Sequence, residues 1–477
     1  MNYQVSVFTK EVSEDRYPAG LAGAVHFALD GESGERIELN RGYGLLFARA
    51  EISPEGTIIP KAVRNPGIFR TSEGEFLICA VRTEENGDPE PAQRMLYWES
   101  EDLIHFTETE AETAEKTAAE EGLLPAVLTE EEAKKVLDFW NTEPGKALVP
   151  FPKARGFADP VFWRHEEKWY FIFTNDNEND IGLYMREADR MEDLLSDETP
   201  LYKILDVDEE AGLIQNFWAP EIHEIGGEIY IFFAVSGREF GPCCHVMKLR
   251  KGGNPADPLA WEKPIPVRRK DGSVLTKPEY LLTEAEKREN RPVTEDFLDD
   301  RFGISLDMTY FEDAGKSYLI WSYRKDIGTP RDSGSMLLIA ETTKEKPWLL
   351  RTDPVLLSRP LYGYENCRGT INNEGPYVYK KNGRIHVNYS GGDARGYLYI
   401  INLLSADSGA DLLDPKSFRK RTTPLCNFKT WTGVYGPGHN SYFTDDQGKD
   451  WILFHAVDTM AGKRIAVGAF AYPENLE

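Results

Sequence analysis

Cysteine is scarce in this sequence of 477 residues. There are five, an odd number, and only Cys243 and Cys244 are adjacent. This pattern fits neither a disulfide framework nor the spacing of a zinc finger, so a reducing compartment is the simplest interpretation. The opening segment, MNYQVSVFTKEV, also lacks a basic stretch followed by an apolar one. We therefore predict a cytoplasmic location.

Long apolar runs and nucleotide-binding motifs are missing as well. No run approaches the ~20 residues that a helix needs to cross a bilayer, so we expect no membrane partner. The sequence contains no GxGxxG between a strand and a helix, no Walker loop and no HExxH. These absences argue against dinucleotide chemistry, nucleotide hydrolysis and zinc proteolysis of the HExxH type, and we expect no organic cofactor.

Positive charge is outnumbered. The chain has 55 Lys and Arg against 80 Asp and Glu, and its formal net charge is -25. A surface of this sign repels phosphate, so nucleic acid is not expected as a partner, and a neutral or cationic molecule is favoured instead. The sequence leaves the oligomeric state open.

Short aromatic strands and turn residues are abundant. Aromatic residues make up 12% of the chain, with 40 Gly and 29 Pro, as is typical of many short strands joined by tight turns. One phrase recurs: a polar or proline-containing lead-in, a brief apolar strand, a turn and a strongly aromatic strand. The copies are NPGIFRTSEGEFLICAV from Asn65, DPVFWRHEEKWYFIFTN from Asp159, APEIHEIGGEIYIFFAV from Ala219, DMTYFEDAGKSYLIWSY from Asp307, EGPYVYKKNGRIHVNYS from Glu374 and HNSYFTDDQGKDWILFHA from His439.

Repeated hairpins of this kind predict an all-β protein. Segments that follow them, such as IGLYMREADRM and YLYIINLLSAD, fit outer strands. Four-stranded antiparallel units that recur along a chain favour the blades of a β-propeller over a sandwich. We place the propeller in residues 151–477. Residues 1–150 would form a β-rich region with one further blade-like unit.

Two stretches interrupt the pattern with short helical insertions. The first is in residues 109–145, where Thr129 and Glu132 of LTEEEAKKVLDFW form a capping box at the start of an amphipathic pattern. The second is in residues 281–302, where Thr283 and Glu286 have the same spacing. These insertions could serve as lids or interface elements. Simple packing against the flank of a blade is the alternative.

The residues that begin the phrases include three carboxylates and a histidine. The innermost strand of each blade lines the central channel, so Asp159, Asp307, Glu374 and His439 should converge on one axial funnel. Like charges held together keep at least one acid protonated at neutral pH. Glycoside hydrolysis uses such a pair, one acid to protonate the leaving oxygen and one carboxylate to activate water. The alternative is that these residues merely cap turns.

The same motifs carry a family resemblance. The run AlaAspPro at 158–160, TrpAlaProGlu at 218–221, the Asp307 phrase, GluGlyPro at 374–376 and GlyHisAsnSer at 438–441 resembles the five-bladed propeller glycoside hydrolases of family 43. The resemblance covers about residues 150–460 and implies a five-bladed β-propeller. It also implies an inverting hydrolase of pentose-containing oligosaccharides, of the α-L-arabinofuranosidase or β-xylosidase type.

The resemblance also implies a role for each matched residue. Asp159 would be the general base, Asp307 would raise the pKa of the acid and orient it, and Glu374 would be the general acid. His439 would lie on the propeller axis, where family members often hold a structural calcium ion (Ca2+). Trp218 would form an apolar wall or stacking face for the sugar, with ordinary core filling as the alternative.

One departure from the family concerns Asn65. Its context, ValArgAsnProGly, is similar to an ArgAspPro start that supplies the base in some members, and an amide cannot take a proton from water. We favour Asp159 as the base because five blades counted from it end at His439, and we predict a substrate-binding role for Asn65. Arg368 is a further candidate for substrate binding. Because such arginines could also cradle phosphate, a glycoside phosphorylase stays an alternative, as does a non-catalytic carbohydrate-binding propeller.

Overall fold

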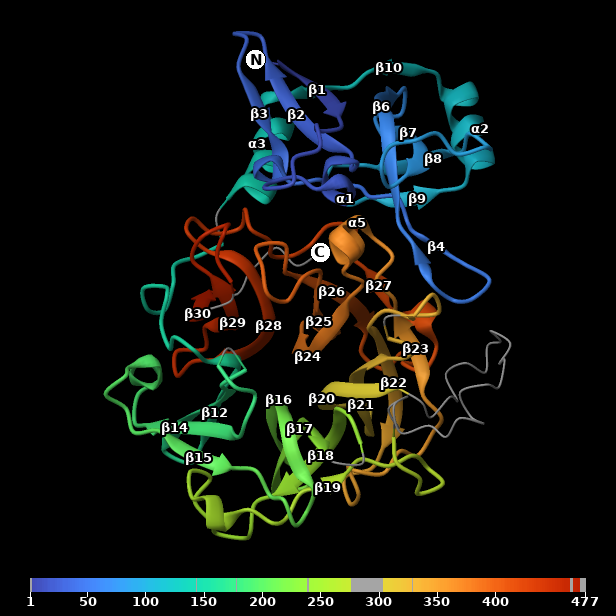
Figure 1. Cartoon of the computed structure of the whole chain (residues 1–477). Coiled ribbons are helices and arrows are strands. Elements are labelled where there is room, and N and C mark those ends of the chain that lie inside the picture. Colours follow the sequence, from blue (N-terminus) through green and yellow to red (C-terminus); the bar gives the residue numbers. More distant parts are fainter. Residues whose placement is uncertain are drawn as a thin grey trace.

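The computed structural model describes residues 2–142, 144–176, 178–237, 240–275, 303–327, 329–463 and 466–471. Most of its regular structure is β-sheet, with few helices (Figure 1). The helices are α1 (Ala19–Ala22), α2 (Ala111–Glu121), α3 (Glu130–Asn141) and α5 (Gly363–Asn366). No helix among the described residues is long and apolar enough to cross a membrane.

Five antiparallel sheets follow one another along the second part of the chain, and in each the strands pair in sequence order. The first is β12 (Ala158–His165), β13 (Lys168–Thr174), β14 (Leu183–Ala188) and β15 (Tyr202–Leu205). The second is β16 (Leu213–Ile225), β17 (Glu228–Gly237), β18 (Cys243–Lys248) and β19 (Ile265–Pro266). The third is β20 (Ile304–Asp313), β21 (Lys316–Arg324), β22 (Met336–Thr342) and β23 (Val355–Ser358). The fourth is β24 (Asn373–Lys381), β25 (Arg384–Gly391), β26 (Ile400–Asp407) and β27 (Arg419–Lys420), and the fifth is β28 (Tyr435–Thr444), β29 (Asp450–Val457) and β30 (Ala466–Ala471).

The five sheets lie around a common centre, with the first strand of each sheet innermost (Figure 1). Each first strand contacts the first strand of the next sheet, and β28 contacts β12. Neighbouring sheets also share their hydrophobic cores. In β13, for example, Tyr170 and Ile172 pack toward the second sheet, while Phe171 and Phe173 pack toward the fifth. Because side chains alternate between the faces of a strand, a strand packed on both faces must be apolar throughout.

A β-bulge interrupts every first strand at its lead-in. The pairing register shifts between residues 158 and 161, 218 and 221, 306 and 309, 374 and 377, and 438 and 441. In each bulge one residue has a left-handed backbone: Asp159, Ala219, Asp307, Gly375 or His439. Such bulges re-aim side chains at the end of a strand. Glu374 precedes the left-handed residue of its sheet, so it lies one position earlier than the other predicted site residues.

The N-terminal region contains two sheets. One has the order β11-β1-β2-β3 and the other β10-β6-β7-β8-β9. Their strands are β1 (Asn2–Phe8), β2 (His26–Gly31), β3 (Arg36–Glu38), β6 (Lys61–Thr71), β7 (Phe76–Glu84), β8 (Met95–Ser100), β9 (Thr107–Thr109), β10 (Leu123–Pro125) and β11 (Val127–Thr129). A separate hairpin, β4 (Glu51–Ile52) and β5 (Ile58–Ile59), extends from this region toward β23 (Figure 1).

The first strand of the second N-terminal sheet repeats the bulge of the five sheets. The register of β6 shifts between Arg64 and Gly67, and Asn65 has a φ of 49°. This local geometry matches the expected blade-like unit. The division of the chain into domains at residue 150 stays a prediction. Residues on the two sides of this boundary share a hydrophobic cluster, in which Leu21 and Phe47 pack with Tyr364 and Tyr397.

The predicted helix after Thr129 is confirmed. Thr129 caps α3, its side chain accepts from the backbone N–H of Glu132, and the Glu132 carboxylate accepts from Thr129 in return. Val136 and Trp140 of this helix are buried in the N-terminal core, so α3 packs against the sheets rather than forming a lid. The second predicted insertion, residues 281–302, lies outside the described residues.

His245 supplies a test of the packing between the sheets. It lies in β18, is buried, and its Nδ1 is 2.8 Å from the carbonyl oxygen of Cys243. Burial lowers the pKa of His245 to about 4. The folded chain therefore holds a neutral imidazole at a pH where the unfolded chain already binds a proton.

We expect His245 to contribute a fall of about 3 kcal/mol in the free energy of unfolding as the pH drops from 6.5 to 4, because at this residue the unfolded state binds more protons across that interval. The His245→Asn variant should lose this component, measured by urea unfolding at pH 7 and at pH 4.5. His105→Asn, at an exposed position, is the matched control and should keep it. An identical pH dependence in His245→Asn and wild type would contradict the assignment.

Candidate active site

Asp159 lies at the inner end of the first sheet and ties it to the second. Its Oδ2 accepts hydrogen bonds from Thr174 Oγ1 and from the backbone N–H of Ala219, both at 3.0 Å. Its Oδ1 lies 3.4 Å from His439 Nδ1 and 3.5 Å from His455 Nδ1. Since His455 Nδ1 also accepts from the Asp159 N–H at 3.2 Å, this nitrogen carries no proton of its own. Of the two imidazoles, His439 is therefore the one that can donate to the carboxylate.

Asp307 repeats the arrangement between the third and fourth sheets. Its Oδ2 accepts from the backbone N–H of Gly375 at 3.0 Å. Gly375 has a φ of 55°, and a Cβ added to it would lie 3.3 Å from His439 Nδ1. Glycine at this position therefore permits both the bulge and the close approach of His439.

Glu374 precedes Gly375 and is held by Tyr399, the residue just before β26 of the same sheet. The Tyr399 hydroxyl donates to Glu374 Oε1 at 2.7 Å. The Tyr399 ring stacks on His455, with 5.7 Å between the ring centroids. On its other side it packs against Gly438, where an added Cβ would lie only 2.0 Å from Tyr399 Cδ1. The glycine of GlyHisAsnSer thus makes room for the tyrosine that orients Glu374.

The closeness of these groups shifts their pKa values. Burial raises the pKa of Asp307 to about 7, the charges of Glu374 and Asp159 add to the rise, and His439 opposes it. Burial alone would lower the pKa of His439, but the carboxylates of Asp159, Asp307, Glu374 and Glu221 outweigh it and raise the pKa. The site therefore holds excess protons near neutral pH, as expected for crowded carboxylates around one imidazole.

The structure adds residues that the sequence interpretation did not assign. Glu221 is buried, its Oε2 lies 3.0 Å from His223 Nε2, and burial raises its pKa. Its place at the end of TrpAlaProGlu was the available signal. Tyr399 immediately precedes β26 and His455 lies in β29, and both belong to aromatic segments whose pattern resembles ordinary core, so no sequence signal separated them from packing residues.

The three predicted substrate-binding residues have different locations. Trp218 is half-buried beside Ala219, and its indole donates to Asp180 Oδ1 at 3.1 Å. Asn65 is exposed in β6, in an N-terminal sheet, so the structure does not bring it to the group around Asp159. Arg368 is exposed between α5 and β24, with Nε 3.7 Å from Glu14 Oε2. Their roles in substrate binding stay predictions.

A metal ion at His439 also stays a prediction. Within the described ranges, no three or more His, Cys, Asp or Glu side chains are grouped so that they could hold an ion. The carboxylates of Asp159, Asp307, Glu374 and Glu221 raise the pKa of His439 against the effect of its burial.

Sequence comparison identifies the family. The family model described as glycosyl hydrolases family 43 matches residues 296–468. An extracellular exo-α-(1→5)-L-arabinofuranosidase of Streptomyces chartreusis is 30% identical over 324 residues, which cover 66% of this chain and 84% of the relative. The chain belongs to glycosyl hydrolase family 43. It is therefore a glycoside hydrolase, with oligosaccharides as its class of substrate.

Two further similarities extend this family 43 assignment. A second extracellular exo-α-(1→5)-L-arabinofuranosidase, from Streptomyces avermitilis, is 29% identical and aligns over 66% of this chain and 57% of its own length. The crystal structure of an α-L-arabinofuranosidase from Lactobacillus brevis is similar with a TM-score of 0.53 and 25% identity, covering 67% of this chain and 92% of that one.

The expected cytoplasmic location is wrong. Both Streptomyces relatives are named extracellular enzymes, which contradicts it. One of the arguments for the prediction was the number and spacing of the cysteines. All five are free thiols in the structure, but a fold with large shared cores between its sheets does not need disulfides, so their absence does not report the compartment.

The contact between Gly438 and Tyr399 yields a prediction. In Gly438→Ala, the new methyl group must displace the Tyr399 ring, so we expect a loss of about 1–3 kcal/mol in stability and a lower kcat, because Glu374 loses its hydrogen-bond donor. Thermal unfolding and glycoside hydrolysis measure the two effects. Gly67→Ala is the control at the corresponding bulge of β6, where the added Cβ would lie 3.3 Å from Cys79 Sγ. Equal effects of the two substitutions would argue against the role of Tyr399.

Proposed function

We propose that this family 43 enzyme is an inverting glycoside hydrolase that acts on pentose-containing oligosaccharides, with Glu374 as general acid and Asp159 as general base. The observation that carries the proposal is the convergence of Asp159, Asp307 and Glu374 around His439. A carboxylate that activates water and an acid that protonates the leaving oxygen are the two groups that such hydrolysis requires.

The surroundings of each carboxylate fit its proposed role. Asp159 Oδ2 is fixed by two donors, which leaves Oδ1, facing His439, to accept a proton from water. Glu374 is oriented by Tyr399. Asp307 is buried beside it, and its raised pKa supports a role as proton-holding neighbour that adjusts the acidity of the site. The backbone donors to the two aspartates belong to the neighbouring sheet rather than to a local turn, which supports a role beyond turn capping.

We further infer that the five sheets form a closed five-bladed propeller. Support comes from the hydrophobic clusters that each pair of neighbouring sheets shares, including the pair formed by the fifth and the first. In such a ring the bulged ends of the inner strands meet at one funnel, where a substrate would reach Asp159 and Glu374 together.

Among pentosides, α-L-arabinofuranosides are the favoured substrates, because the Streptomyces and Lactobacillus relatives carry that activity in their names. β-Xylosidase activity is the other member of the proposed class. A structural calcium ion near His439 is retained as a prediction, and assays with and without a chelator test it.

The assignment of acid and base predicts a dependence on the leaving group. Glu374→Gln should lower kcat on an arabino-oligosaccharide by roughly 10²–10⁴-fold, since protonation of the leaving oxygen is lost. On an aryl α-L-arabinofuranoside with an activated leaving group, which needs little protonation, the loss should be much smaller. Asp159→Ala should remove activity on both substrates. Equal loss on both by Glu374→Gln would refute its role as the acid.

A parallel assay separates the remaining alternatives. Wild type, Asp159→Ala and Asn65→Asp are compared on aryl α-L-arabinofuranoside and aryl β-D-xyloside, with proton NMR of the first-formed sugar anomer. We expect wild type and Asn65→Asp to be equally active, with product of inverted configuration, because Asn65 lies in the N-terminal sheet. A silent wild type together with an active Asn65→Asp would move the base to residue 65.

A further inference from the structure

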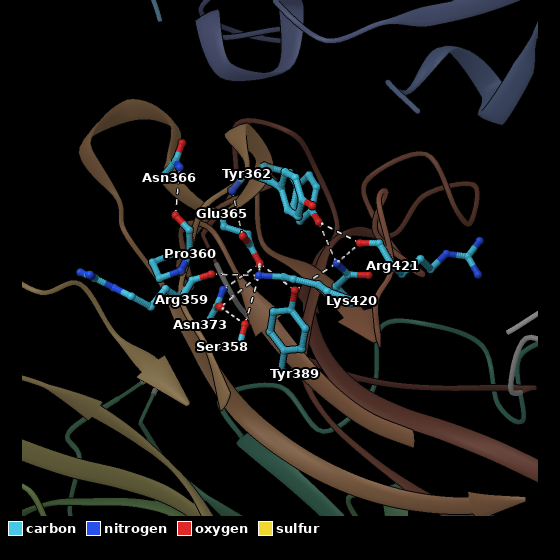
Figure 2. A network of polar contacts seen from close by, with 12 residues as sticks. Ser358, Arg359, Pro360, Tyr362, Glu365, Asn366, Asn373, Tyr389, Lys420 and Arg421 are labelled. Atoms are coloured by element: carbon cyan, nitrogen blue, oxygen red, sulfur yellow. Dashed lines mark hydrogen bonds and ion pairs between the residues drawn. The ribbon is translucent and has the colours of Figure 1, made fainter. Parts of the chain in front are cut away.

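An ion pair with a fully buried carboxylate lies next to the segment that carries Glu374. Glu365 of α5 is fully buried, and Lys420 of β27 reaches it with Nζ 2.6 Å from Oε1 (Figure 2). The Tyr389 hydroxyl donates to the same oxygen at 2.7 Å, and Asn373 Nδ2 donates at 2.9 Å. The backbone N–H of Tyr362 donates to Oε2 at 3.0 Å. Oε1 thus has three donors and Oε2 has one, as expected for a buried carboxylate.

The same cluster holds the backbone next to Glu374. Asn373, the residue before it, is fully buried, and its side-chain oxygen accepts from Ser358 Oγ at 2.8 Å and lies 3.4 Å from Lys420 Nζ. Its carbonyl oxygen accepts from Ser322 Oγ at 3.0 Å. The N–H of Asn372 donates to the carbonyl oxygen of Glu365 at 3.0 Å. Residues 372 and 373 are therefore fixed through both side-chain and main-chain contacts.

This arrangement is costly unless it serves a purpose. Burial lowers the pKa of Lys420, and the charge of Glu365 opposes that shift. A buried pair of opposite charges is often replaceable by apolar residues without loss of stability, so fold stability alone does not account for it. Such pairs do provide a single, rigid geometry, which is what a general acid needs at the leaving oxygen.

We propose that Glu365, paired with Lys420, is a positioning residue that fixes Asn373 and thereby places the carboxyl group of Glu374. The inference rests on the proposed function, because it takes Glu374 as the general acid. Glu365 acts through Asn373 and the backbone rather than by touching substrate. Its loss should therefore impair proton donation more than binding.

The N-terminal region takes part in this positioning. Helix α1 packs against α5 with Gly20 facing Gly363, and a Cβ added at Gly20 would lie 2.8 Å from the Gly363 carbonyl oxygen. The N–H of Ala50 donates to the Leu361 carbonyl oxygen at 2.7 Å. α5 is thus held from the N-terminal side, and the residues before position 150 contribute to the geometry of the acid.

The leaving-group dependence of Glu365→Gln tests the proposal. We expect kcat on an arabino-oligosaccharide to fall on the order of 10²-fold, as for a misplacement of about 1 Å, with KM little changed. The loss on an aryl arabinofuranoside with an activated leaving group should be much smaller. Glu90→Gln is the matched control: Glu90 is a buried glutamate paired with Lys61 and Arg82 in the N-terminal region, and its loss should leave the ratio of the two activities at the wild-type value.

A second variant protects the test from misfolding. Glu365→Gln leaves Lys420 without its charged partner, so the double variant Glu365→Gln/Lys420→Gln removes both charges together. Circular dichroism and thermal unfolding select the folded variants. A folded single or double variant with the wild-type ratio of activities would overturn the proposal. If Glu374→Gln itself shows no dependence on the leaving group, the proposed function has failed rather than this inference.

The N-terminal contribution is tested at α1. Gly20→Ala should lower the ratio of activity on the arabino-oligosaccharide to activity on the activated aryl arabinofuranoside, as Glu365→Gln does. The reason is that the added methyl group pushes on α5. Gly23→Ala is the control on the same helix end, since its added Cβ would meet Ala62 within the N-terminal region at 2.5 Å and not α5. A folded Gly20→Ala protein with the wild-type ratio would overturn the part assigned to α1.

Discussion

The active site depends on one kind of hydrogen bond, in which an aspartate carboxylate on one sheet accepts the backbone N–H of the bulge on the next. Asp159 accepts from Ala219, and Asp307 accepts from Gly375. Hydrogen bonds to charged groups contribute about 1.5–3 kcal/mol, roughly twice as much as neutral ones. The same carboxylates therefore connect neighbouring sheets and are the groups that we propose for the chemistry.

Bringing these carboxylates together creates repulsion between like charges, and the imidazole of His439 lies among them. Four carboxylates, those of Asp159, Asp307, Glu374 and Glu221, raise the pKa of one imidazole. Their charges favour the protonated form of His439, and burial raises the pKa of Asp307 to about 7, so both shifts reduce the net negative charge of the cluster. Shifted pKa values of this kind cluster at functional sites, whereas stability alone would favour apolar residues.

The family 43 similarity and the N-terminal region meet at α5. The alignment with the first Streptomyces relative covers 66% of this chain, and the family model matches residues 296–468, which include α5. The N-terminal sheets are not merely appended, since Leu21 and Phe47 share a hydrophobic cluster with Tyr364 and Tyr397. The ion pair of Glu365 and Lys420 begins at α5, which α1 contacts, so packing between the two regions can reach the strand that carries the proposed acid.

From the sequence alone it was possible to predict the local structure and to name the candidate reactive groups. Alternating apolar residues on strands such as β13, the capping box at Thr129 and the motifs at Asp159, Asp307, Glu374 and His439 depend on short-range patterns, which a single chain displays directly. Tertiary structure alone decided which acid has its pKa raised by burial, that Tyr399 reaches Glu374, and that Asn65 lies in another sheet. It also revealed that Glu374 lies one residue before the left-handed position of its bulge, whereas Asp159, Asp307 and His439 occupy that position in theirs. These properties arise from contacts between strands far apart in sequence, and no local period encodes which distant side chains will meet.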